Sequence, residues 1–169
     1  MSDFGIIVDA GGTLFAAGAA LASWASVMRA QKDADERRRP SLQVAILQEG
    51  SGRASTTIAI LNAGAGTATG TVCVAKVGDD CFANPVGPGF LLYQQKALFK
   101  AKMQATNDRK ALVSCRDLDG TVWAWSQAGQ RKRYGQNVDP QLDSEQLWID
   151  FYGAKLDGKR VAAELSVFE

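Results

Sequence analysis

The chain opens with a long run of small and apolar residues that carries almost no charge. No charged side chain occurs from Ala10 to Met28, and Asp9 is the only one between Phe4 and Met28. As a helix, residues 4–28 would extend roughly 37 Å, which is enough to cross a hydrocarbon core of about 30 Å. The run therefore predicts a transmembrane helix, with membrane lipid around residues 10–28.

Small residues recur at every fourth position of this run. They form two stripes, one of Gly12, Ala16 and Ala20 and one of Gly18, Ala22 and Ser26. Such stripes let a second helix approach closely in lipid, so we expect helix packing through them and leave a homo-oligomer open. Two alternatives remain: an alanine-rich helix buried against protein, and an interfacial or flexible tail.

The charges that flank the run set the predicted orientation. Basic residues follow it, partly offset by acidic ones, in the set Arg29, Lys32, Asp33, Asp35, Glu36, Arg37, Arg38 and Arg39. By the positive-inside rule, a single-pass protein of this kind has its C-terminal domain in the cytoplasm. A secretory signal is not indicated, because in a signal the basic residues precede the apolar run.

Composition restricts what the rest of the chain can do. Residues 1–40 are assigned to the helix and its charged extension, so residues 41–169 make one globular domain. The net charge is +1 and the chain contains no histidine. The small net charge predicts no nucleic-acid partner. Because histidine is the commonest general base and transition-metal ligand, its absence leads us to expect no metal, no cofactor and no enzyme activity.

The three cysteines, Cys73, Cys81 and Cys115, lack the spacing of a zinc or redox motif. The sequence favours small buried hydrophobic side chains on strands. A disulfide between Cys73 and Cys81 would instead indicate an oxidising compartment and reverse the predicted orientation.

From Ser41 the apolar period changes to two. Residues 42–47 and 56–61 alternate on either side of a turn at Gly50–Gly52, which predicts an antiparallel hairpin. Further strands are expected at residues 69–77, 91–93, 98–104, 111–116, 121–127 and 131–134, with a loop at 82–89. Lys96, Lys100 and Lys102 share one side of the pleat and suggest an edge strand. The pattern predicts a mainly β fold, an antiparallel sandwich of about seven strands.

The C-terminal part has a different pattern. Asp139-Pro140 is typical of a helix start, and apolar residues then recur until Gly153, so we expect a short C-terminal helix. Residues 161–168 are interpreted as a strand.

The order of these features resembles a type of small protein found in actinobacteria and their phages. The resemblance rests on the apolar helix, Arg39-Pro40, the strand at 42–47, Asn62-Ala-Gly64 and Asp117-Leu-Asp-Gly-Thr-Val-Trp123. Proteins of this type have one membrane helix and an immunoglobulin-like β-sandwich with an N-x-G signature. The resemblance implies that fold and carries no shared activity.

The glycine-rich connection after the second strand invites a phosphate-loop interpretation, which the sequence disfavours. Gly64, Gly66 and Gly70 lack the Gly-Lys-Ser/Thr of a P-loop, and a β-run follows instead of a helix. We expect Asn62 to hydrogen-bond neighbouring backbone, and Gly64 and Gly66 to allow positive φ.

Two other groups of residues suggest binding. Asp79-Asp80 and Asp117/Asp119 could hold Ca²⁺ if their two turns met at one end of the sandwich. Trp123 and Trp125, with Arg131 and Arg133, could form an aromatic and basic interaction surface. Their alternation on one strand favours the sandwich core for both rings.

The sequence thus predicts a non-enzymatic, membrane-anchored module that binds an unidentified protein partner. The alternative is a structural subunit of a larger assembly, such as a phage particle, in which the N-terminal helix is buried against neighbouring subunits.

Overall fold

The computed structural model describes residues 24, 26–34, 38–50, 52–87 and 89–168. The chain divides into two compact units, Met1–Arg37 and Arg38–Glu169. In the first unit, residues 24 and 26–34 are helical. Among the described residues, no helix is both long and apolar enough to cross a membrane. Most of the predicted span at 10–28 lies outside them, as do the packing residues Gly12, Ala16, Gly18, Ala20 and Ala22.

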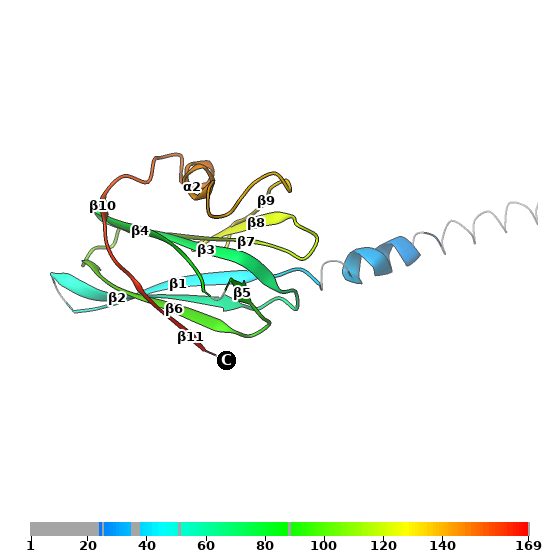
Figure 1. The fold of residues 1–169 in the computed structure, drawn as a ribbon, viewed down its shortest axis with the longest axis horizontal. Helices are drawn as coiled ribbons and strands as arrows, with labels where there is room; N and C mark the ends of the chain where they lie inside the picture. Colours follow the sequence, from blue (N-terminus) through cyan, green and yellow to red (C-terminus); the bar gives the residue numbers. More distant parts are fainter. Residues whose placement is uncertain (1–23, 25, 35–37, 51, 88, 169) are drawn as a thin grey trace, which may run out of the picture. The chain divides into compact units, whose positions relative to one another are not determined.

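The second unit is mainly β and contains two sheets (Figure 1). One sheet has the order β1-β2-β6-β11, made of Leu42–Glu49, Arg53–Asn62, Lys96–Gln104 and Glu164–Phe168. The other has the order β10-β4-β3-β7-β8-β9, made of Lys159–Arg160, Asp80–Pro85, Ala68–Val77, Arg109–Arg116, Val122–Ser126 and Arg131–Arg133. The short strand β5, Phe90–Leu91, pairs with β3.

The predicted first hairpin is confirmed. Strands β1 and β2 pair antiparallel in a register that joins Leu42 to Asn62 and Glu49 to Ser55. The alternation of the sequence appears as alternation of burial, because Leu42, Val44 and Ile46 are buried while the residues between them are exposed.

The core between the sheets is built from the inward faces of both. Ile58, Ile60 and Phe99 come from one sheet, and Cys73, Val113 and the two tryptophans of β8 come from the other. A second core covers the outer face of the seven-stranded sheet. There Val72, Val74, Leu112 and Ala124 pack under Leu147 and Trp148 of helix α2, Ser144–Tyr152 (Figure 1).

The C-terminal predictions hold in type but not in every boundary. Helix α2 ends at Gly153, whose φ of 68° gives the left-handed cap. Its first helical residue is Ser144, because Asp139 instead closes a turn by accepting hydrogen bonds from the backbone N–H groups of Gln141 and Leu142. The final strand is confirmed as β11.

Several sequence predictions were wrong. The sheet is not wholly antiparallel, because β10 pairs parallel with β4, and the described residues contain eleven strands instead of about seven. Residues 82–85 belong to β4 and not to a loop. The edge predicted for β6 was wrong for residues 96–100, because β11 pairs with them; the lysines of β6 face solvent on the outer side of the sheet.

The side chain of Asn62 connects the start of β1 with the loop after β2 and with β5. Its buried amide donates to Gly66 O and Leu91 O at 2.7 and 3.0 Å and accepts from Ser41 N and Gly64 N at 3.2 and 3.1 Å. The predicted hydrogen bonding to neighbouring backbone is therefore confirmed.

The predicted reason for the two glycines was wrong. Neither Gly64 nor Gly66 has positive φ. A Cβ on Gly64 would lie 2.4 Å from Ser41 N, and one on Gly66 would lie 1.9 Å from Arg38 O. Glycine is needed at these positions because another stretch of backbone passes too close for a side chain.

Candidate binding groove along strand β1

Strand β1 is an edge of the four-stranded sheet, paired with β2 on one side only. Ala63 N donates to Ser41 O at 2.9 Å, so Ser41 directs its backbone groups toward β2. In an antiparallel pair, successive residues of a strand direct their backbone groups alternately toward the partner strand and away from it. By that alternation the N–H and C=O groups of Leu42, Val44, Ile46 and Gln48 point away from β2. Within the described part of the chain no strand pairs with this side of β1.

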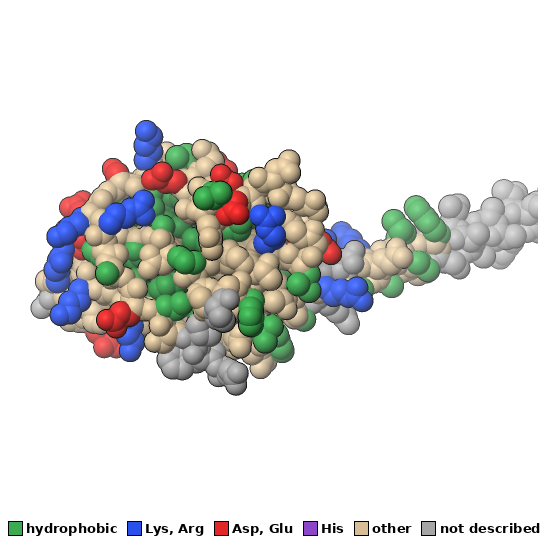
Figure 2. Space-filling model, in the orientation of Figure 1, with side chains coloured by type: hydrophobic (Ala, Val, Ile, Leu, Met, Phe, Trp, Pro, Cys, Tyr) green, Lys and Arg blue, Asp and Glu red, His purple; other side chains and the backbone are tan. Residues whose placement is uncertain are grey.

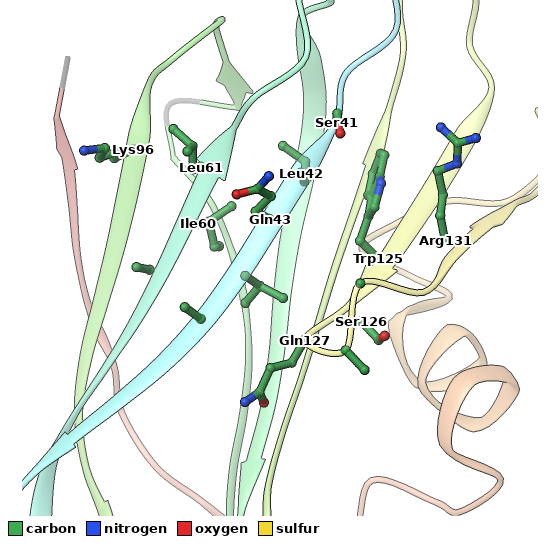
Figure 3. A pocket seen from close by; sticks show the side chains of 15 residues that line it. Ser41, Leu42, Gln43, Ile60, Leu61, Lys96, Trp125, Ser126, Gln127 and Arg131 are labelled. Atoms are coloured by element: carbon green, nitrogen blue, oxygen red, sulfur yellow. The ribbon is translucent and has the colours of Figure 1, made fainter. Parts of the chain in front are cut away.

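A groove of about 860 Å³ follows this open edge (Figure 3). Residues of β1, β2 and β6 form one part of its lining, and the hairpin between β8 and β9 forms the other. In the view of Figure 3, Lys96 and Arg131 lie on opposite sides of β1, and Trp125 lies between β1 and Arg131. The groove is open to solvent.

The aromatic wall of the groove is supported from behind. Trp125 is 5% exposed, and its ring is stacked on Trp123 at a centroid distance of 6.4 Å. The indole Nε1 of Trp123 donates to Asp117 Oδ2 at 2.9 Å. Asp117 Oδ1 accepts from the N–H groups of Asp119 and Thr121 in the β7–β8 turn. The turn therefore fixes the ring of Trp123, on which the ring of Trp125 is stacked.

Three arginines cover the ring of Trp123. The guanidinium carbons of Arg39, Arg131 and Arg133 lie 5.3, 5.2 and 5.8 Å from its centroid. None of the three forms an ion pair within 4.0 Å among the residues that the structure describes. Cation–π attraction stabilises this arrangement, and it leaves positive charge at the rim of the groove.

The charged groups that line the groove are both cations, Lys96 and Arg131. The remaining lining is apolar or neutral and includes Leu42, Val44, Ile60, Leu61, Gln43 and Gln127. The hydroxyl of Ser126 accepts from Gln130 N at 3.2 Å. Such a lining can bind apolar side chains, backbone amides and carboxylates, and no residue in it is placed as a nucleophile beside a base.

The residues predicted from sequence for an interaction surface fall into two groups. Trp123 and Trp125 lie in the core, at 6% and 5% exposed, which confirms the core interpretation of both rings. Arg131 and Arg133 are exposed on β9, at the edge of the seven-stranded sheet. Trp125 and Arg131 line the groove, whereas Trp123 and Arg133 do not.

Sequence reasoning missed the open edge of β1. The available signal was the composition of residues 42–48, which include no charge, proline or glycine. Edge strands usually carry such residues to prevent pairing with other chains. The sequence could not reveal which strand would be the edge, because that depends on the order of strands in the sheet.

The other candidate groups are not assembled into a site. Asp80 and Asp117 lie at opposite ends of the seven-stranded sheet, because Val77 pairs with Arg109 at the beginning of β7 and Asp117 follows its end. The two turns therefore do not meet as a calcium site requires. Cys73, Cys81 and Cys115 are free and buried on strands, as the sequence favoured. Burial raises the pKa of each of these thiols.

The fold and the groove define a class: a two-sheet β-sandwich with an open sheet edge beside an aromatic wall. Comparisons with protein-family models, with curated proteins and with solved structures gave no match.

Proposed function

We propose that this chain is a non-enzymatic protein-interaction module that binds an extended segment of a partner along β1. The observation that carries the proposal is the groove of about 860 Å³ beside an eight-residue edge strand. An extended peptide can add to such an edge through main-chain hydrogen bonds, while pockets for alternate side chains supply specificity. The cations Lys96 and Arg131 favour a partner segment that places carboxylates at the two sides of the groove.

The strand order supports an immunoglobulin-like sandwich, a fold widely used for binding. The order β1-β2-β6 in one sheet and β4-β3-β7-β8 in the other corresponds to A-B-E and C′-C-F-G of that fold. Strand β11 occupies the position next to β6 where an immunoglobulin domain has its D strand. This correspondence also supports the resemblance to small actinobacterial and phage proteins that the sequence suggested.

The lining of the groove, as far as the structure describes it, places no nucleophile beside a base, which is consistent with a binding role. The chain has no histidine, and the groove is lined by no carboxylate. The cysteines of β3, β4 and β7 are buried, with thiol pKa values raised by burial, so they are poor nucleophiles near neutral pH.

We propose further that the N-terminal segment anchors the chain in a membrane, with the sandwich in the cytoplasm. Residues 24 and 26–34 of this segment are helical. Three apolar side chains of this helix, Trp24, Val27 and Met28, are exposed, and Val27 and Met28 follow Trp24 by three and four residues. These spacings place the three apolar side chains on one helix face, where lipid or a neighbouring helix can cover them.

Carbonate extraction tests the anchor. The full chain should stay with the membrane pellet, and a chain beginning at Pro40 should be released. Release of the full chain would contradict the anchor and leave the alternative, a subunit of a larger assembly.

Selection from a displayed library of random ten-residue peptides tests the groove. We expect enriched peptides that alternate apolar residues and carry Asp or Glu. On binding, amide exchange at Leu42, Val44 and Ile46 should slow, because their N–H groups point out of the sheet. Ala128→Trp, which fills the groove from the β8–β9 turn, and Arg131→Glu should each weaken binding at least about tenfold.

Two matched variants serve as controls. Leu118→Trp adds an exposed indole in another turn, and Lys155→Glu makes the same charge change on an exposed residue outside the groove. Both should bind as the parent does. Equal binding by all four variants would refute the groove. Self-association that only the groove variants lose would favour the assembly subunit instead.

A further inference from the structure

A second depression, of about 540 Å³, lies away from the β1 groove and is strongly basic. It is lined by the beginning of β2, the later part of β6, and the segment that runs from β10 to β11. Figure 2 shows Lys and Arg side chains gathered at the left-hand end of the sandwich, where Figure 1 places β10 and the β1–β2 hairpin. The β1 groove uses the opposite half of β2, residues 59–61.

Five cations and one acid line this depression: Arg53, Lys100, Lys102, Lys159, Arg160 and Glu164. Arg53 pairs with Asp80 at 3.5 Å, and Arg160 pairs with Glu145 at 3.8 Å. Within the described residues the three lysines have no ion pair within 4.0 Å. In a chain of net charge +1, this is a local excess of positive charge, and an anionic partner would relieve it.

The depression also exposes a piece of unpaired strand. Ala105 N donates to Gly52 O at 2.8 Å, so the alternation of the ladder points the N–H and C=O groups of Lys102 away from β2. On that side β11 pairs with β6 only as far as Lys100, opposite Glu164. Beyond that point the chain of residues 161–163 turns away toward β10, whose partner is β4. The peptide groups of Lys102 are therefore left at the open end of the ladder.

These features fit a polypeptide better than a nucleic acid. The lining contains no aromatic side chain on which a base could stack. An open strand edge, in contrast, is complementary to the backbone of an extended peptide.

We propose that this basic depression binds an extended acidic segment of a partner protein. The carboxylates pair with Lys100, Lys102 and Lys159, and the segment's backbone pairs with Lys102. This surface is independent of the β1 groove, so a partner can engage one without the other.

A labelled hexa-glutamate peptide is the probe. We expect it to bind the full chain and its affinity to fall steeply between about 50 and 200 mM salt. The double variant Lys100→Glu/Lys102→Glu should lose at least about tenfold in affinity. Lys110→Glu/Lys155→Glu makes the same change in net charge at exposed positions outside the depression and should bind as the parent does. Melting temperatures of both variants check that each is folded.

Amide exchange distinguishes a seated peptide from diffuse attraction. Exchange at Lys102 should slow at least about fivefold when the peptide binds, because its N–H then has a partner. Equal loss of affinity in both double variants, or unchanged exchange at Lys102, would overturn the proposal. Tighter binding of an oligothymidylate, or of phosphatidylserine vesicles, than of the peptide would overturn it in favour of a phosphate-bearing partner.

Discussion

The indole nitrogen of Trp123 donates a hydrogen bond to Asp117 Oδ2 at 2.9 Å, and both residues are buried. This bond joins the β7–β8 turn to the aromatic core beside the β1 groove. Because the other carboxylate oxygen caps the turn, one side chain fixes the turn and the ring together.

Asp117→Asn should destabilise the sandwich. If the amide oxygen keeps the two backbone bonds of the turn, the amide N–H groups face the indole N–H, so a buried donor loses its acceptor. We expect the free energy of unfolding to fall by about 1–3 kcal/mol, measured by urea denaturation. Asp119→Asn changes an exposed carboxylate of the same turn and should have little effect. Equal losses in the two variants would contradict the role given to the Trp123 bond.

Gly66→Ala should displace the backbone that leads into β1. The added Cβ would overlap Arg38 O, so residues 38–41 must move and the hydrogen bonds of Asn62 must stretch. We expect a loss of at least about 2 kcal/mol in the free energy of unfolding. Gly135→Ala is the matched control, because its Cβ would meet nothing within 4 Å and its φ is not positive. A neutral Gly66→Ala would show that the close approach is easily relaxed.

Arg116 should hold the segment before α2 against the seven-stranded sheet. Its guanidinium donates to Gly120 O, Gln136 O and Val138 O at 3.2, 3.0 and 2.9 Å. Arg116→Lys keeps the charge but cannot reach three carbonyls, so amide exchange in α2 should speed up and stability should fall by about 1–3 kcal/mol. Arg109→Lys, in the same strand, provides the comparison. Unchanged exchange in α2 would refute this role.

Stability should fall as the pH rises above about 9. Burial raises the pKa of Cys73 and Cys115 above the ordinary thiol value of 9.0, and it raises the pKa of Tyr152 to about 12. Above pH 9 the unfolded chain releases thiol protons that the folded chain keeps, so the unfolded state is favoured progressively.

Urea denaturation at several pH values measures this slope, which is at most about 1.4 kcal/mol per pH unit for each thiol. Cys73→Ala/Cys115→Ala should be less stable at neutral pH but should lose stability less steeply above pH 9. An identical slope in parent and variant would show that these thiols do not cause the decline.

The local pattern of the chain was sufficient for much of the fold. Alternation at residues 42–47 and 56–61, and the turns between strands, depend on neighbours in sequence, and the hairpin follows from them. The same is true of the helix that ends at Gly153. The candidate site was harder to predict from the sequence. The pattern indicated Trp125 and Arg131 as binding residues, but it did not indicate the groove that they line.

What the sequence could not supply is the order in which strands meet. Lys96, Lys100 and Lys102 suggested an edge because one face of β6 is charged, yet β11, which follows far later in the chain, covers that edge as far as Lys100. The second core under α2 and the close approach of the Arg38 backbone to Gly66 also arise from segments far apart in the chain.

By itself, the sequence determined that an uncharged N-terminal run precedes a β domain without histidine, because composition and periodicity are properties of neighbouring residues. Only the tertiary structure decided that one side of β1 has no partner among the described strands, that arginines cover the ring of Trp123, and that five cations share one depression. The physical reason is that sheet edges, cavities and charge clusters form where strands and helices from distant parts of the sequence come together. Which of these elements become neighbours depends on the packing of the whole core.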